Sequence, residues 1–114
     1  MNFEIISEKV TDWAKARQII PNSTPMAQAM KGMEEASEWL QAATAISILS
    51  KDDPQYQYWL DKFKDGVGDV LVTIVNSAAL ANVNVIECFN IAYNEIKDRT
   101  WKMNEKGIFV KNDK

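Results

Sequence analysis

The sequence predicts an all-α protein, a bundle of four helices. Apolar residues recur at steps of three and four, and Thr24-Pro25 and Asp53-Pro54 are pairs typical of a helix start. The segments between the predicted helices are short, so consecutive helices should be antiparallel neighbours, as in a bundle. The 114 residues suffice for one domain with a modest core, which we expect to span residues 1–114.

The first helix is expected over residues 3–20, where Ile6, Val10 and Trp13 recur at helical spacing. Trp13 and Arg17 lie one helical turn apart. Arg17 either covers the edge of a buried Trp13, or the two side chains form a stacking surface that contacts a phosphate or a base. The sequence leaves both interpretations open.

The second helix is expected from Pro25 to Leu49, with Ser23 or Thr24 as its N-cap. A stripe of residues at three- and four-residue steps predicts its packed face. The members of this stripe are Met26, Met30, Met33, Ser37, Leu40, Thr44 and Ile48. Glu34 and Glu38 flank the stripe, where their carboxylates would be partly desolvated unless a positive group lies near them.

The third helix is expected over residues 54–82, with Asp53 as its N-cap. Its second half, residues 67–81, is apolar except for Gly68 and one polar strip. Asp69, Thr73, Asn76 and Ser77 form this strip, and Asp65 extends it backwards by one turn. A single polar strip on an apolar helix is either its only wet face or the wall of a polar cavity. The helix alone does not decide between these two.

The fourth helix is expected over residues 84–99, because Asn84 and Glu87 resemble a capping box. The end of this helix is basic, with Lys97, Arg99 and, just beyond, Lys102. Cations there either stabilise the helix dipole or bind phosphate oxygens. Residues 107–111, which begin with Gly107, are β-prone and should form a short extended arm.

Composition excludes several functions. The net charge of −3 and the pI of about 4.9 argue against nucleic acid as a partner. The absence of histidine excludes His-based acid–base chemistry and His metal sites, and Cys88, the one cysteine, should be a small core residue. No signal peptide and no apolar run of ~18–20 residues is found, so we expect no membrane partner and a cytoplasmic location.

An acidic cluster stands out in the second helix. Glu34, Glu35 and Glu38 are spaced i, i+3 and i, i+4, so their like charges repel on one helix surface. The cluster is either a solvated acidic patch or a site for a divalent cation such as Mg²⁺, which prefers carboxylate and phosphate oxygens.

The motif Lys31-x-x-Glu34-Glu35-x-x-Glu38, followed one helix later by Gly68-Asp69, resembles the MazG-like nucleoside triphosphate pyrophosphohydrolases. The resemblance extends over nearly the whole chain and points to the short phage and bacterial type. Further segments that carry it are Trp13-Ala14-x-x-Arg17, Ser23-Thr24-Pro25-x-x-Gln28, Lys64-Asp65, Ala92-Tyr93-Asn94 through Arg99, and Gly107 through Lys111.

The resemblance implies a MazG-like helix bundle. The implied activity is the hydrolysis of a nucleoside triphosphate at its α-phosphorus, assisted by Mg²⁺ or Mn²⁺, to a monophosphate and pyrophosphate. It makes Glu35, Glu38 and Asp69 metal ligands, with Asp65 as a further one, and gives Glu34 and Glu38 catalytic roles, Glu34 orienting or deprotonating the water. It makes Lys31, Lys97, Arg99, Lys102, Asn94, Gln28, Trp13 and Arg17 candidates for substrate binding.

One position departs from the family pattern. The family's E-x-x-D motif would place glutamate at position 66, where this chain has Gly66, and Asp65 is the neighbour that would take its place. The resemblance also implies a homodimer or a dimer of dimers, and the host cytoplasm if a phage encodes the chain. Two alternatives stay open: a helical interaction module without activity, and an enzyme that acts on the alarmone ppGpp.

Overall fold

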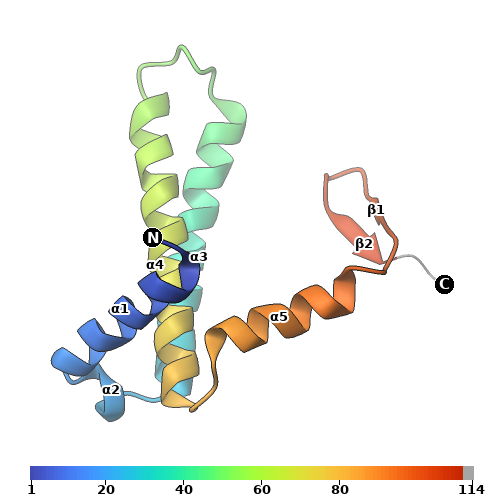
Figure 1. The fold of residues 1–114 in the computed structure, drawn as a ribbon. Coiled ribbons are helices and arrows are strands. Elements are labelled where there is room, and N and C mark those ends of the chain that lie inside the picture. Colours follow the sequence, from blue (N-terminus) through green and yellow to red (C-terminus); the bar gives the residue numbers. More distant parts are fainter. Residues whose placement is uncertain (112–114) are drawn as a thin grey trace.

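Helix α3 (Pro25–Ile48) and helix α4 (Tyr56–Leu80) lie side by side and antiparallel, and the rest of the chain is arranged around this pair (Figure 1). The computed structural model describes residues 1–111. Residues 112–114, the end of the expected 1–114 domain, lie outside the described residues. The all-α class is confirmed.

Small residues let α3 and α4 approach closely. A Cβ atom built on Gly66 of α4 would lie 2.9 Å from both Cα and Cβ of Trp39 on α3. A Cβ atom on Gly32 of α3 would lie 2.8 Å from Thr73 Oγ1 on α4. A side chain at position 66 would push the helices apart, because it meets the Trp39 backbone, whereas a side chain at position 32 would require the Thr73 hydroxyl to move.

The methionine stripe of α3 was expected in the core, and this prediction is wrong. Met26, Met30 and Met33 are all exposed. The face that meets α4 includes Gly32 and Trp39, which is offset from the methionine stripe by one residue, or about 100° around the helix. The closest contact with α4 is therefore made by the glycine-containing face, and the methionines lie beside it. Met33 still borders α4, because it lines a hollow together with Ile74 and Ser77.

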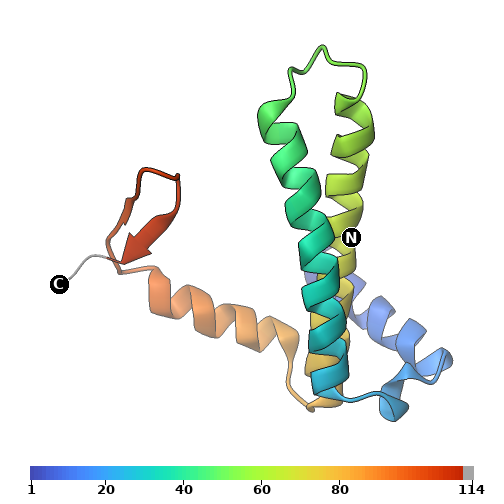
Figure 2. The same ribbon diagram turned by 180° about the vertical axis from the view of Figure 1, so that it is seen from behind.

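Helix α1 (Phe3–Ala16) crosses α4 on one side of the helix pair and buries Ala14 completely (Figure 2). Asn2 caps it by accepting a 2.8 Å hydrogen bond from the Ile5 backbone N–H. The helix ends earlier than expected because Gln18 adopts the left-handed conformation, with φ of 60°. A separate short helix follows, α2 (Ile19–Asn22), which contains the cis Ile20–Pro21 bond.

The expected caps of the later helices are mostly confirmed. Thr24 Oγ1 accepts a 3.0 Å hydrogen bond from the Ala27 N–H at the start of α3. Asn84 Oδ1 accepts from Ile86 and Glu87 at the start of helix α5 (Val85–Ile96). Asp53 is the exception, because it accepts from Gln55 within the loop and α4 begins only at Tyr56.

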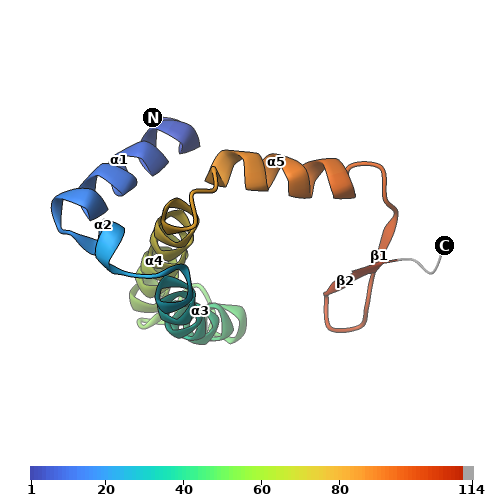
Figure 3. The same ribbon diagram turned by 90° about the horizontal axis from the view of Figure 1, so that it is seen from below.

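Helix α5 extends away from the α3–α4 pair (Figure 3). Within one chain it therefore does not close a four-helix bundle, although its start contacts α1 through Phe3 and Phe89, whose ring centroids are 6.2 Å apart. Cys88 on α5 is exposed, so its expected place in the core is wrong. The helix ends at Ile96, before Lys97 and Arg99.

The expected C-terminal arm is one strand of a small hairpin. Strand β1 (Trp101–Met103) pairs antiparallel with β2 (Phe109–Lys111), and Lys102 lies opposite Val110. Asn104 Oδ1 accepts hydrogen bonds from the Lys106 and Ile108 N–H groups, and Gly107 has a φ of 77°. A left-handed glycine and a polar turn residue explain why the chain reverses here.

The hydrophobic core of the single chain is small. Among the described residues its buried hydrophobic side chains are Ala14, Ala42 and Val75. The radius of gyration is 16.9 Å, against about 13 Å expected for a compact domain of this length. The accessible surface of 8760 Å² likewise exceeds the roughly 6300 Å² expected of a compact monomer of this mass.

The lengths and apolar content of the described helices bear on whether any of them could span a membrane. None of them is both long and apolar enough to cross a bilayer by itself, and α4 with α5 meets the length and composition criteria only as a pair bent by 106°.

Candidate functional site

The polar strip of α4 is buried at Thr73 and Asn76 and open to water at Asp65 and Asp69. Thr73 and Asn76 are buried, while Leu71 and Ile74 on other sides of the same helix are exposed. Ser77 at the end of the strip donates a 2.8 Å hydrogen bond to the Pro25 carbonyl of α3. Of the two interpretations left open by the sequence, the strip is therefore the wall of a polar hollow.

We call the first part of this region the Asn76 hollow. It has a volume of about 470 Å³ and lies between α1, α3 and α4. Its polar and aromatic lining consists of Trp13, Gln28, Lys31, Glu35, Asp69, Thr73 and Asn76, and its apolar lining of Ile19 and Val72. Small-molecule sites have volumes of roughly 300–1,000 Å³, so the hollow has the size of such a site.

The second part is the Glu38 hollow, of about 330 Å³, between α3 and α4. It is lined by Glu38, Asp65 and Asp69, together with Gln41, Tyr58, Trp59, Lys62 and Gly66. Asp69 lines both hollows. Carboxylates of two helices therefore line two adjoining hollows that share Asp69.

Electrostatics support this arrangement. Partial burial raises the pKa of the Asp69 carboxyl above its usual value, and the negative charges of Glu35 and then Asp65 raise it further, while Lys31 lowers it. Asp69 remains accessible to water, which limits the size of these effects through solvent screening. Carboxylates that repel one another at a partly desolvated position would be stabilised by a cation.

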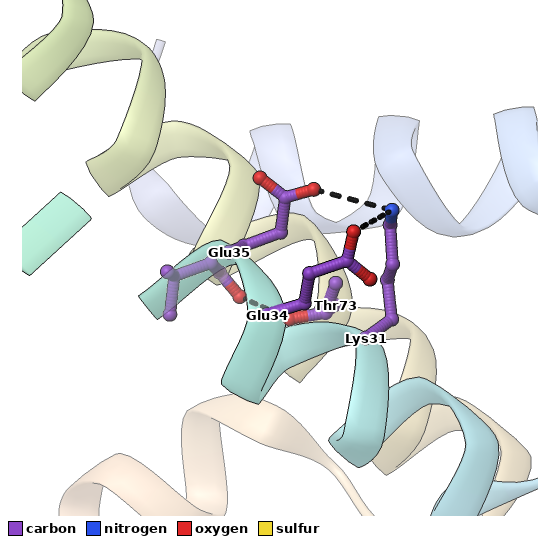
Figure 4. A network of polar contacts seen from close by, with 5 residues as sticks. Lys31, Glu34, Glu35 and Thr73 are labelled. Atoms are coloured by element: carbon purple, nitrogen blue, oxygen red, sulfur yellow. Dashed lines mark hydrogen bonds and ion pairs between the residues drawn. The ribbon is translucent and has the colours of Figure 1, made fainter. Parts of the chain in front are cut away.

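Lys31 supplies a positive charge beside Glu34 and Glu35. Its Nζ lies 3.5 Å from a carboxylate oxygen of Glu34 and 3.5 Å from one of Glu35 (Figure 4). The Glu34 charge, followed by the hydrogen bond to Glu35, raises the pKa of Lys31. The Glu35 side chain is 14% exposed and points toward α4, whereas that of Glu34 is 63% exposed.

The residues present suit a divalent cation whose coordination is completed by other ligands. Within residues 1–111, no group of three or more His, Cys, Asp and Glu side chains is already arranged to hold a metal ion. Mg²⁺ is usually bound by one or two carboxylates together with phosphate oxygens and water. The oxygen donors of Glu35, Glu38, Asp65 and Asp69 are of this type. After partial burial, the charges of Glu35 and then Asp65 raise the pKa of Asp69, so these two carboxylates act on it electrostatically.

Position 66 cannot supply the missing family glutamate in this arrangement. A Cβ atom there would lie 2.9 Å from the Cα of Trp39, so any side chain requires the two helices to separate. Asp65 lines the Glu38 hollow beside Asp69 and is the carboxylate available nearest to position 66.

The predicted substrate-binding residues divide into two groups. Trp13, Gln28 and Lys31 line the Asn76 hollow, and the Arg17 guanidinium lies 5.1 Å from the centre of the Trp13 ring. Trp13 is partly exposed, so Arg17 covers a ring that also borders the hollow. The remaining residues lie in α5 or beyond it, on the part of the chain that extends away from both hollows; these are Asn94, Lys97, Arg99 and Lys102.

Glu34 is also separate from the two hollows, because it lines neither of them and instead pairs with Lys31 on the surface. Conversely, the predicted site residues did not include Thr73 and Asn76. The polar strip on an apolar helix was the signal for them. Asn76 is only 2% exposed and its Oδ1 has no hydrogen-bond partner within the described part of the chain, a condition that costs roughly 1–3 kcal/mol.

Comparison with known proteins identifies the fold. No protein-family model and no curated protein matches the sequence. A solved structure of similar fold is the MazG-like pyrophosphohydrolase of cyanophage S-2L, bound to dGDP and three catalytic Mn²⁺ ions per active site. The likeness has a TM-score of 0.62 at 20% identity and covers 99% of this chain and 94% of that one. The chain therefore has the MazG-like fold.

Proposed function

We propose that this protein is a nucleoside triphosphate pyrophosphohydrolase that depends on Mg²⁺, or on Mn²⁺ in its place. The observation that carries the proposal is the meeting of carboxylates from two helices, Glu35 and Glu38 of α3 with Asp65 and Asp69 of α4, beside a hollow of nucleotide size. A pyrophosphohydrolase of the same fold binds a nucleotide and Mn²⁺, which supports the proposal.

Glu35, Glu38, Asp69 and Asp65 would hold the cation. A bound cation would supply neutralisation of phosphate charge and activation of water for hydrolysis at the α-phosphorus. The products are a nucleoside monophosphate and pyrophosphate. Asp69 would contribute most because it is the one carboxylate that borders both hollows.

Lys31 is proposed to exchange partners when the substrate binds. In the structure it neutralises Glu34 and Glu35 with two ion pairs of 3.5 Å. A triphosphate carries more negative charge than these two groups, so its oxygens would compete for the Lys31 ammonium. Release from Lys31 would leave Glu35 available to the cation. Glu34 lines neither hollow and is 63% exposed, so its predicted role in orienting or deprotonating the water would require its side chain to turn toward the Asn76 hollow.

The base and sugar are proposed to occupy the Asn76 hollow. Trp13 offers a ring face for stacking, and the amide of Gln28 offers polar contacts. Gln28 already donates a 3.1 Å hydrogen bond from Nε2 to Ser23 Oγ, which holds its side chain in place.

A second copy of the chain is proposed to complete the site. The large exposed surface and the small core of one chain require apolar faces to be covered by another, as in a homodimer or dimer of dimers. Helix α5 extends outward from its own α3–α4 pair. In such an assembly Asn94, Lys97, Arg99 and Lys102 would reach the triphosphate bound by the partner.

The experiment is a pyrophosphate-release assay with Mg²⁺ and a panel of ribo- and deoxynucleoside triphosphates, with ppGpp included. We expect equal amounts of monophosphate and pyrophosphate from at least one triphosphate. If ppGpp alone is hydrolysed, the substrate is the alarmone and not a nucleoside triphosphate. If the folded protein hydrolyses none of these compounds, an interaction module without activity is favoured.

The variant Glu38→Gln should abolish hydrolysis, because one ligand charge is lost, while its metal-free melting temperature should not fall. Glu8→Gln on α1, outside both hollows, is the matched control and should keep full activity. Full activity of Glu38→Gln would remove the argument for a metal site at the carboxylates.

A further inference from the structure

Within the described part of the single chain, no contact explains why a polar asparagine occupies the buried position 76. It is the most buried of the residues that line the Asn76 hollow, and its Oδ1 accepts no hydrogen bond from residues 1–111. Asparagine is also a poor residue for the middle of a helix. Stability alone would favour an apolar residue here, as at Val72 and Val75 on the same helix.

The position of Asn76 relates it to the carboxylates. It follows Asp69 by seven residues, which is about two turns and roughly 10 Å along the same side of α4. The antiparallel pairing places Gly32 opposite Thr73 and Pro25 opposite Ser77. Gln28, one turn before Gly32, therefore lies level with Asn76, and Glu35 lies level with Asp69.

The hollow thus has two chemically different ends. Glu35, Asp69 and Lys31 make one end charged, and Gln28 and Asn76 make the other end neutral and polar, with Trp13 along the wall. A nucleotide has the same division, since its phosphates are charged and its base is neutral, planar and rich in hydrogen-bonding groups.

We propose that Asn76 selects the nucleobase: its side chain would turn so that the buried Oδ1 faces the hollow and accepts a hydrogen bond from an N–H group on the edge of the base. This inference rests on the proposed nucleotide site, and it assigns the choice of base to a residue distant from the phosphate chemistry. A base that lacks the donor would leave Oδ1 buried and unpaired, so it is rejected.

The test uses nucleoside monophosphates without metal, so that binding is measured independently of hydrolysis. The binding of the four deoxynucleoside monophosphates is followed by the NMR signals of the Trp13 indole and the Asn76 side-chain amide. An analogue of the preferred monophosphate, in which the base N–H is replaced by N–CH₃ or C–H, is then compared with its parent. Wild type should bind the parent at least tenfold more tightly than the analogue.

The variants Asn76→Leu and Asn76→Ala should lose this preference and bind parent and analogue within about twofold. Asn76→Leu should also melt at a higher temperature without ligand, because it removes the unpaired oxygen at similar volume. Asn22→Leu, at an exposed position outside the hollow, should retain the wild-type preference.

The inference would be overturned by an unchanged base preference in both Asn76 variants, or by no binding of any monophosphate by wild type. It would also be overturned by a loss of assembly in the variants, because Oδ1 would then contact another copy of the chain. A preference that depends on Asn76 in a protein that releases no pyrophosphate would refute the proposed hydrolysis alone. Hydrolysis with a base preference independent of Asn76 would refute this inference alone.

Discussion

Alanine substitutions at the two glycines in the middle of α4 test the close contact of α3 and α4. Gly66 and Gly68 lie in the same helix, two residues apart. A Cβ atom on Gly66 would lie 2.9 Å from the Cα and Cβ of Trp39, whereas a Cβ atom on Gly68 would have no neighbour within 4 Å. The substitution of each by alanine adds the same methyl group to the same helix, but only one methyl group meets another helix.

The two substitutions should change the free energy of unfolding in opposite directions. Each alanine gains roughly 0.5–1 kcal/mol of helix stability over glycine. For Gly66→Ala this gain is opposed by overpacking of about 1–3 kcal/mol, because the obstructing atoms include the backbone of Trp39, which cannot rotate away. We expect Gly66→Ala to lose up to about 2 kcal/mol and Gly68→Ala to gain up to about 1 kcal/mol.

The assay is thermal and urea unfolding of both variants, followed by circular dichroism at a fixed protein concentration, because an assembled protein melts in a concentration-dependent way. A shift of about 4–8 °C per kcal/mol is expected for a domain of this size. Equal stabilisation by both substitutions would refute the close contact at Trp39. By the same geometry Gly66→Glu should separate the helices, so it should not rescue the loss of a neighbouring carboxylate.

Two further predictions concern the carboxylates. Asp69→Asn should raise the melting temperature of the metal-free protein at pH 7. The raised pKa of Asp69 means that its ionisation destabilises the folded state. The wild-type protein therefore loses stability as the pH rises from the normal aspartate pKa through the folded-state pKa. The difference between the two proteins should vanish below the normal pKa of 3.8, where both side chains are neutral, and a variant that melts lower at pH 7 would contradict the interpretation. Asp65→Asn should increase the Mg²⁺ concentration needed for half-maximal hydrolysis, while Asp61→Asn, one turn earlier and outside the Glu38 hollow, should not. An unchanged Mg²⁺ dependence of Asp65→Asn would make Asp65 a surface residue.

The sequence by itself determined the features that depend on near neighbours in the chain. Thr24 and Asn84 cap their helices as expected, because a cap bonds to backbone groups only two or three residues away. The spacing of Glu35 and Glu38 put each of them beside α4, where they line the Asn76 hollow and the Glu38 hollow respectively, but it did not separate them from Glu34, which lines neither.

Only the tertiary structure decided which face of each helix is buried. The methionine stripe and the glycine-containing face of α3 differ by one residue in register, and only the close approach of α4 selects the second. The same contact turned Asn76 inward and left position 66 without room for a side chain. Helix α5 had the pattern of a bundle helix, but its direction depends on the turn before it and on packing partners, which local periodicity does not encode.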